Sequence, residues 1–340
     1  MINVAVVGLG FMGITHLKAY RNIPNARIAA LCDAVRLPVD GVLAAAGGNI
    51  GSDDSLHFDM TQVKATHDLA ELLADPSIDL IDICVPTLAH PKLAIAALRA
   101  GKHVICEKPL ARTAAAAREI AEAAAAAKGF FMPAMCIRFW PAYAWLKQAI
   151  DEQSYGRVLA ARFRRVSEPP AWGREHFFDG AKSGGAILDL HIHDADFVQY
   201  CFGRPTAVFA QGFTHYSGAI DHVVAQYQVA GGAAVSAEGG WVMGEGHGFE
   251  MAYTIIFENA TLDFNSKRGA EALRLFEKGQ APLTISLPPG DGYLAELSYM
   301  IDCIASNQAP TTVTAGDGAS AVEICEAEGE SIRTGQLVSL

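Results

Sequence analysis

Two side chains in the second half of this sequence have the types and spacing of a proton-transfer pair. Asp189 and His193 are four residues apart, so on a helix they lie on one face. A histidine beside a carboxylate is a good general base near neutral pH. Lys108 follows an apolar run at residues 102–106, and a lysine there can donate to a substrate hydroxyl oxygen and stabilise negative charge on it. The three residues are candidates for acid–base chemistry, although a lysine after a strand is more often simply solvated.

The other polar residues around His193 raise the question of a metal site. His191 and His193 are two residues apart and point to different sides of a helix, so we expect no chelate between them and no bound metal. A strand in place of the helix would favour a metal. We expect His191 to be an ordinary hydrogen-bonded helix histidine, with a proton shuttle as the alternative.

A glycine-rich turn predicts a dinucleotide site. Residues 8–13 read G-x-G-x-x-G, between an apolar run at 2–7 and a helix pattern that reaches about residue 20. Gly8 permits the tight turn, Gly10 lets the backbone approach a pyrophosphate, and Gly13 allows close packing of helix on strand. Asp33 follows the next apolar run, where a carboxylate accepts from ribose hydroxyls and repels a 2′-phosphate. We therefore expect NAD rather than NADP, although Arg36 nearby weakens that preference. The alternative is a turn without a ligand.

The hydrophobic pattern divides the chain into two kinds of structure. Up to about residue 135, apolar runs alternate with helical stretches, which predicts βαβ units and a parallel sheet with helices on both faces. Beyond that point, successive strands without intervening helices predict a mostly antiparallel sheet, with runs at 158–166, 207–214, 223–229, 233–240, 252–257 and 261–264. Helices are expected at 185–201, 293–306 and 316–329. Residues 40–61 are expected to be an insertion or mobile loop.

Composition excludes several classes of partner. The 340 residues carry a net charge of −11, which argues against nucleic acid and against an anionic membrane surface. No stretch reaches the ~18 uninterrupted apolar residues of a spanning helix, and no signal-type segment precedes the first strand. Seven cysteines without a short disulfide spacing pattern indicate reduced thiols. We expect a cytoplasmic protein.

Three motif clusters together resemble those of the glucose–fructose oxidoreductase, inositol dehydrogenase and rhizopine-catabolism (Gfo/Idh/MocA) family. The first is the glycine-rich turn continued to His16. The second comprises V-P-T-x-x-H at 85–90, A-G-K-H-V at 100–104 and E-K-P at 107–109. The third is S-G-G-x-x-x-D-x-x-x-H-x-x-D at 183–196. The resemblance covers nearly the whole chain.

The resemblance implies an α/β protein. A Rossmann dinucleotide-binding domain is expected over residues 1–128, and an α+β substrate-binding and oligomerisation domain with a large open sheet over 129–340. It implies hydride transfer between NAD(P) and a sugar, inositol or related polyol, with Lys108, Asp189 and His193 as the catalytic residues. The expected cofactor-binding residues are Gly8, Gly10, Phe11, Met12, Gly13, Asp33, Pro86, Thr87, His90 and Glu107. The expected substrate-binding residues are Lys108, Arg138, Trp172, Asp189 and His193.

Two departures from the family pattern leave alternatives open. Ala186 and His191 stand where glycines are usual, and His191 is expected to affect substrate choice or pocket shape. Other reactions on the same scaffold are an NAD-dependent glycosidase with transient oxidation and an imine or enone reductase. A non-enzymatic NAD-binding sensor is a further alternative. Because an open sheet would expose a broad apolar face, we expect a homodimer or homotetramer.

Overall fold

The chain of this computed structural model, described for residues 1–48 and 54–340, forms two compact units. The first unit comprises Met1–Phe139 and Asp291–Ala319, and the second comprises Trp140–Gly290 and Ser320–Leu340. In the described part of the chain, no helix combines the length and the apolar character that a bilayer-spanning segment requires. Each unit has its own sheet and is described separately.

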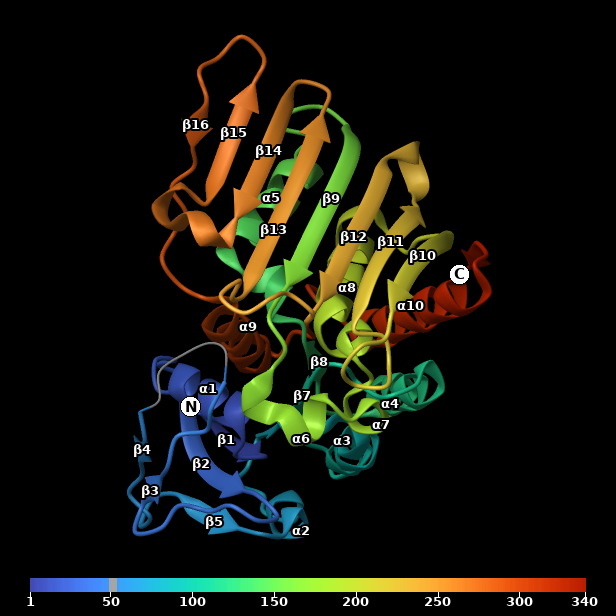
Figure 1. Ribbon diagram of the computed structural model, residues 1–340. Coiled ribbons are helices and arrows are strands. Elements are labelled where there is room, and N and C mark those ends of the chain that lie inside the picture. The colour runs from blue at the N-terminus through green and yellow to red at the C-terminus, as the bar shows by residue number, and fades with distance from the viewer. Residues whose placement is uncertain (49–53) are drawn as a thin grey trace. The chain divides into compact units, whose positions relative to one another are not determined.

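The first unit contains a six-stranded parallel sheet in the order β5-β2-β1-β6-β7-β8 (Figure 1). The predicted alternation of strands and helices is confirmed. The strands are β1 (Ile2–Val7), β2 (Ala26–Cys32), β5 (Lys64–Thr66), β6 (Leu80–Ile83), β7 (His103–Glu107) and β8 (Phe131–Ala134). The helices are α1 (Phe11–Tyr20), α2 (Leu69–Leu73), α3 (His90–Arg99), α4 (Ala114–Ala126) and α9 (Gly292–Ser306), with short 3₁₀ turns η1 (Thr87–Ala89) and η2 (Cys136–Phe139).

Local sequence signals fix where these elements end. Gly101 has φ +77° just past α3, its N–H donates to Leu98, and the next N–H, of Lys102, donates to Ala97. This is a Schellman motif, as the glycine at this position predicts. Thr113 caps α4 by accepting from the Ala116 N–H. The turn at Gly101 leads the chain directly into β7, which precedes the proposed catalytic lysine.

The expected insertion at 40–61 contains a small hairpin. Strand β3 (Val42–Leu43) pairs antiparallel with β4 (Leu56–His57). Residues 49–53 of this prediction lie outside the described residues. The part before them packs on the glycine-rich turn, because a Cβ at Gly48 would lie within about 2 Å of the Phe11 ring.

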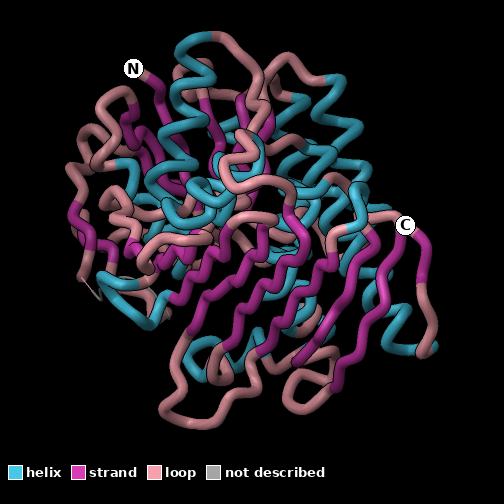
Figure 2. Tube along the Cα trace, turned by 90° about the horizontal axis from the view of Figure 1, so that it is seen from above, coloured by secondary structure: helices cyan, strands magenta, loops and turns pink. Residues whose placement is uncertain are grey.

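The second unit contains a nine-stranded sheet in the order β16-β15-β14-β13-β9-β12-β11-β10-β17, seen as one continuous layer in Figure 2. Neighbouring strands in the described residues pair antiparallel except β9 with β12, so the prediction of a mostly antiparallel sheet is confirmed. The strands are β9 (Val158–Val166), β10 (Ala207–Phe213), β11 (His222–Gln228), β12 (Ala234–Gly240), β13 (Glu250–Phe257), β14 (Ala260–Asn265), β15 (Leu273–Glu277), β16 (Leu283–Thr284) and β17 (Val338–Ser339).

Alternation along these strands places apolar side chains on one face of the sheet. In β11, Val223, Ala225 and Tyr227 are buried while the residues between them are more exposed. Helices α5 (Pro141–Asp151), α8 (Ile192–Phe202) and α10 (Ala315–Thr334) lie against this face (Figure 1). Edge-to-face rings such as Tyr143 against Tyr253, 5.2 Å between centroids, fill the layer between helix and sheet.

The opposite face of the nine-stranded sheet differs from the expected apolar surface. Its centre carries an ion-pair ladder in which Arg164 contacts Glu238 at 3.0 Å and also contacts Glu250. Cross-strand register explains the first pair, since Arg164 lies directly opposite Glu238. Exposed apolar side chains on this face, such as Val224 and Ile256, lie among the polar ones. The expectation of a broadly apolar face is therefore wrong.

The helix predicted at 185–201 begins differently from the expectation. Gly184 and Gly185 both have positive φ, +89° and +76°, so an α-helix cannot run through them. A π-helical turn, η4 (Ile187–His191), follows these glycines, and α8 begins at Ile192. The physical reason is that two consecutive left-handed residues break the helical backbone, which periodicity alone does not reveal.

Candidate functional site

The glycine-rich turn after β1 has the geometry of a dinucleotide-binding loop. Gly8 has φ +94°, and a Cβ there would lie 2.5 Å from the Cys84 carbonyl oxygen. A Cβ at Gly13 would lie 1.9 Å from the Gly8 carbonyl oxygen. At Gly10, by contrast, no heavy atom of residues 1–48 and 54–340 other than those of its chain neighbours lies within 4 Å of the Cβ position. The open space above Gly10, at the N-terminus of α1, is where a pyrophosphate fits.

Asp33 holds this loop and remains half-buried at the end of β2. One carboxylate oxygen accepts from the Leu9 N–H at 2.7 Å, and the other accepts from the N–H groups of Val35 and Arg36 at 2.8 and 2.9 Å. A carboxylate has about four acceptor positions, so it retains capacity for ribose hydroxyls. The Arg36 guanidinium donates to the carbonyls of Leu9 at 3.1 Å and Ala45 at 3.0 Å, which occupies donors that a 2′-phosphate would need.

His90 connects the turns after two neighbouring strands. Its ring is buried, with Nδ1 2.9 Å from the Pro109 carbonyl and Nε2 2.8 Å from the Val85 carbonyl. Burial lowers the pKa of His90. Pro86 and Thr87 lie in the turn that this ring braces, Pro86 as the residue before η1. The predicted cofactor-binding residues 86–90 are thus gathered at the carboxyl edge of the parallel sheet.

Glu107 points into the protein and meets His16, a residue that the site prediction did not include. One Glu107 oxygen lies 3.1 Å from His16 Nε2, and the other accepts from the Lys108 N–H at 3.0 Å. His16 Nδ1 lies 2.8 Å from Asp82. Burial by itself would lower the pKa of His16, but Asp82 and the neighbouring Cys84 raise it well above the ordinary value. His16 is therefore a buried cation between two carboxylates.

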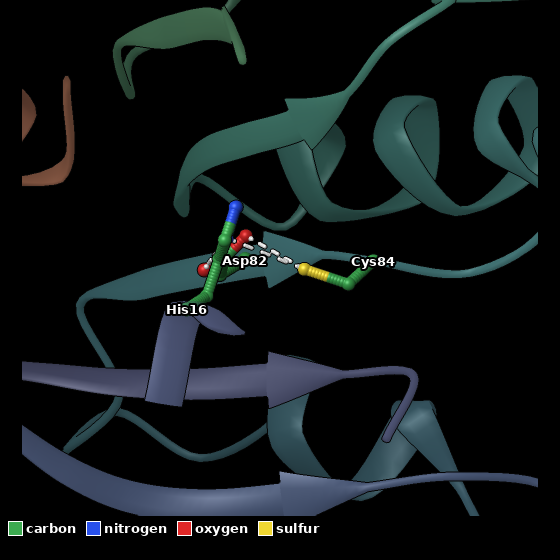
Figure 3. A group of neighbouring side chains, drawn as sticks. All are labelled: His16, Asp82 and Cys84. Atoms are coloured by element: carbon green, nitrogen blue, oxygen red, sulfur yellow. Dashed lines mark hydrogen bonds and ion pairs between the residues drawn. The ribbon is translucent and has the colours of Figure 1, made fainter. Parts of the chain in front are cut away.

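The cluster in Figure 3 also has the residue types of a metal site. His16 Nδ1, an Asp82 oxygen and the Cys84 sulfur lie within 4.8 Å of one another. Burial raises the pKa of the Cys84 thiol well above its usual range, and the nearby charge of Asp82 raises it further. The thiol therefore keeps its proton, and the His16 proton fills the space toward Asp82. In the described residues these three side chains form a hydrogen-bonded ion-pair network.

Arg138, predicted to bind substrate, lies in η2 of the first unit. Its guanidinium is buried, donates to the Thr312 carbonyl at 2.7 Å and lies 3.4 Å from Asp317. These contacts fasten η2 to the segment that leads into α10. Lys108 itself is half-buried and precedes Pro109 in a cis peptide bond.

The second unit carries Asp189, His193 and Trp172. Asp189 is a half-buried residue of η4, and His193 is a buried residue in the first turn of α8. Trp172 lies in a short turn, η3 (Ala171–Gly173), and is 42% exposed. Its ring meets Phe177 edge-on at 4.8 Å, and Phe177 meets Trp241 at 5.8 Å. No local sequence pattern predicts this aromatic row, because its members lie in different segments.

His191 is hydrogen-bonded, as expected, but it is not exposed. Its Nε2 lies 3.2 Å from the Tyr227 hydroxyl and 3.2 Å from Glu328 of α10. The side chain thus points away from solvent, under the nine-stranded sheet. Neither partner was among the predicted site residues, because both are distant in sequence.

Comparison with known proteins agrees with this architecture. Residues 2–135 match the oxidoreductase family with an NAD-binding Rossmann fold, and residues 143–263 match the GFO/IDH/MocA C-terminal domain. A solved levoglucosan dehydrogenase, in complex with NADH and L-sorbose, superposes with a TM-score of 0.83 and 25% identity over 99% of this chain and 98% of that chain.

Two curated relatives are similar in sequence. Levoglucosan dehydrogenase of Pseudarthrobacter phenanthrenivorans is 33% identical over 216 residues, which cover 62% of this chain and 53% of that protein. The aligned region thus spans about half of that relative. The scyllo-inositol 2-dehydrogenase (NAD(+)) of Bacillus subtilis is 27% identical over 100% of this chain and 96% of that protein.

The Rossmann sheet, the open glycine loop and the matched second sheet define a two-part NAD-binding oxidoreductase. The chain belongs to the Gfo/Idh/MocA family of such enzymes.

Proposed function

We propose that this protein is an NAD-dependent dehydrogenase that transfers a hydride between a sugar, inositol or related polyol and the nicotinamide cofactor. The observation that carries the proposal is the glycine loop, open only at Gly10 and braced by Asp33. The names of the relatives, which act on levoglucosan and on scyllo-inositol, support the substrate class. The Asp33 carboxylate and the occupied Arg36 guanidinium favour NAD over NADP.

We assign cofactor binding to the carboxyl edge of the parallel sheet. The backbone at Gly8, Gly10 and Gly13 receives the pyrophosphate, with Phe11 and Met12 in the first turn of α1. Pro86, Thr87 and His90 shape the passage for the ribose and nicotinamide, and Glu107 lies at the end of the next strand. Bound NAD supplies the hydride acceptor. We propose residues 1–128 as the cofactor domain and 129–340 as the substrate domain, although 291–319 pack in the first unit.

Three residues are assigned to the chemical step. His193 Nε2 or Nδ1 takes the proton from the substrate hydroxyl as the carbon–hydrogen bond transfers its electron pair. Lys108 donates a hydrogen bond to the developing alkoxide oxygen. Asp189 orients His193 or binds a neighbouring hydroxyl. The hydride is transferred to the nicotinamide, the ketone leaves, and His193 returns to its starting state by releasing the proton to solvent. The reverse reaction uses the same groups.

Substrate recognition is assigned to Trp172 and Arg138 in addition to the three catalytic residues. The exposed Trp172 ring, supported by Phe177, offers an aromatic face that suits the C–H face of a sugar ring. We further propose a homodimer or homotetramer formed through the open sheet, whose exposed face carries the Arg164 ion pairs together with apolar side chains such as Val224 and Ile256. Light scattering that finds only monomer would exclude this assembly. The seven free cysteines support a cytoplasmic location.

Rates of NADH formation test the assignment of the residues. Loss of the base in His193→Ala is expected to lower kcat by about 10²–10⁴-fold, with NAD binding unchanged. Lys108→Met is expected to lower kcat as well, because the alkoxide loses its donor. Unchanged turnover in His193→Ala, with intact NAD binding, would remove His193 from the mechanism.

A further inference from the structure

A buried polar network in the second unit includes His191, which lies two residues before the proposed base, His193. Its members are His191 from η4, Tyr227 from β11 and Glu328 from α10, and their side chains are 0%, 5% and 0% exposed. The Tyr227 hydroxyl donates to one Glu328 oxygen at 2.6 Å. His191 Nε2 lies 3.2 Å from the same hydroxyl and 3.2 Å from the other Glu328 oxygen. Three elements are thus joined through one histidine.

The directions of these hydrogen bonds follow from the number of protons available. Tyr227 has one hydroxyl proton, and the short contact to Glu328 uses it. The tyrosine oxygen can therefore only accept from His191, so Nε2 must carry a proton. Burial alone would lower the pKa of His191, but the Glu328 carboxylate raises it above the ordinary value, which favours the proton on Nε2. The nearby charges of Asp194 and Arg165 pair with each other at 2.8 Å.

The sheet is shaped to receive the His191 ring. A Cβ at Gly239 of β12 would lie 2.6 Å from His191 Nδ1 and 2.7 Å from its Cβ. Real Cβ atoms do not approach that closely, so only glycine at position 239 leaves room for the ring. The ring is therefore fixed on one side by contact with β12 and at its tip by Tyr227 and Glu328.

The backbone that carries this ring needs such an anchor. Two left-handed glycines, Gly184 and Gly185, precede the π-helical turn. A π turn is a rare conformation that is not maintained by helical propensity. His191 is the last residue of the turn, with Asp189 two residues before it and His193 two residues after it. A shift of His191 would move both.

We propose that His191, held by Tyr227 and Glu328, is a positioning residue that fixes Asp189 and His193 in their productive places. The proposal rests on the proposed dehydrogenase function, because the network is proposed to position the catalytic residues of that same site. Small displacements of catalytic groups have large effects, since about 1 Å can cost on the order of 100-fold in rate.

Two tyrosines of the second unit give a matched test. Tyr227→Phe removes a buried hydroxyl from the network. Tyr253→Phe removes one that donates to the Ala142 carbonyl at 2.7 Å, away from the π turn. We expect faster amide hydrogen exchange over residues 187–193 and a several-fold lower kcat in Tyr227→Phe alone. NAD affinity is expected to stay unchanged in both, because the dinucleotide loop belongs to the first unit.

A second pair of variants separates positioning from mere packing. His191→Gln keeps an N–H donor near the Nε2 position, and His191→Leu keeps volume without a donor. We expect His191→Leu to lower kcat by about 10–100-fold and His191→Gln to recover much of that loss. If His191→Leu does not fold, the comparison of Tyr227→Phe with Tyr253→Phe still tests the positioning role.

The outcomes for the network and for the enzyme are distinguishable. Equal exchange over 187–193 in Tyr227→Phe and wild type overturns the proposal, and so does an equal loss of kcat in Tyr253→Phe. Faster exchange with full kcat also overturns it, because the turn then moves without consequence. If the wild-type protein makes no NADH from any polyol, the proposed function fails, while exchange still decides whether the network holds the turn.

Discussion

His16 Nε2 lies 3.1 Å from the carboxylate of Glu107, which joins the helix after the glycine loop to the residue preceding Lys108. The contact is buried, and Asp82 lies 2.8 Å from the other ring nitrogen. One protonated imidazole therefore pairs with two carboxylates that would otherwise lack a cationic partner inside the first unit. The cofactor loop and the strand end that carries the proposed catalytic lysine share this support.

Replacing His16 is expected to be costly in a pH-dependent way. His16→Gln leaves Asp82 and Glu107 without a cation, which should lower the free energy of unfolding by about 3–5 kcal/mol. Because the folded-state pKa of His16 is raised, its contribution is fully present below the ordinary pKa of 6.5 and is lost as pH rises through the higher folded-state value.

Urea unfolding of wild type and His16→Gln across pH 6 to 9 measures this dependence. We expect the difference between the two proteins to be largest at the acidic end and to shrink as the pH increases. A difference that stays constant or grows with pH would contradict a charged His16.

Replacing Glu296 of α9 is expected to stabilise the protein, whereas replacing His16 is expected to destabilise it. The Glu296 side chain is fully buried, and neither oxygen has a hydrogen-bond partner among the residues that the structure describes. Burial raises the pKa of Glu296 well above 4.5. His16 opposes this shift, whereas the charges of Glu107 and Asp82 add to it. For such an acid, stability is lost as pH rises from the unfolded pKa toward the folded one. Glu296→Met should therefore raise the free energy of unfolding at pH 7 by about 1–3 kcal/mol, and a lower melting temperature for the variant would refute this.

Two glycines of the loop, three residues apart, are expected to have different roles: Gly10 in NAD binding and Gly13 in the stability of the fold. Gly10→Ala places its methyl in open space, so the melting temperature should stay within a few degrees of wild type while NAD affinity falls at least about tenfold. Gly13→Ala is the matched comparison, since its Cβ would collide with the Gly8 carbonyl at 1.9 Å and should destabilise the fold itself. Thermal melting measures the stability of each variant, and a separate fluorescence titration of the folded protein with NAD measures its affinity. Together they distinguish a loss of binding from a loss of stability. Full NAD affinity in Gly10→Ala would exclude this loop as the pyrophosphate site.

Cofactor preference depends on the charge of Asp33. Asp33→Asn can still accept from the Leu9 N–H, but it no longer repels a 2′-phosphate. We expect the ratio of kcat/KM for NAD over NADP to fall by about tenfold, equivalent to about 1.4 kcal/mol. An unchanged ratio would show that another residue sets the preference. The substitution Arg36→Gln serves as a control for the neighbouring guanidinium.

The parts of this molecule that depend on short stretches of sequence were predictable. The glycine loop, Asp33 and the alternation of strands with helices follow from local patterns, and the structure has them where the patterns place them. The succession of strands without intervening helices likewise predicted the second sheet.

Contacts between distant segments were not predictable in the same way. No local pattern links His16 to Glu107, or His191 to Glu328, because each pair is brought together only by the fold. The π turn was missed for a different reason. Its cause is the backbone conformation of Gly184 and Gly185, whereas residue spacing alone is compatible with a continuous α-helix.

The central claim is net oxidation of a polyol by bound NAD, and the most direct measurement is NADH absorbance set against the ketone formed. Purified protein and NAD are mixed with a panel of inositols, aldoses, sugar acids and anhydrosugars, and both products are quantified. The account predicts that one subset yields NADH and ketone in equal amounts. Sugar turnover without net NADH, as in an enzyme that recycles its cofactor within each cycle, would contradict it, and so would tight NAD binding with no turnover of any substrate.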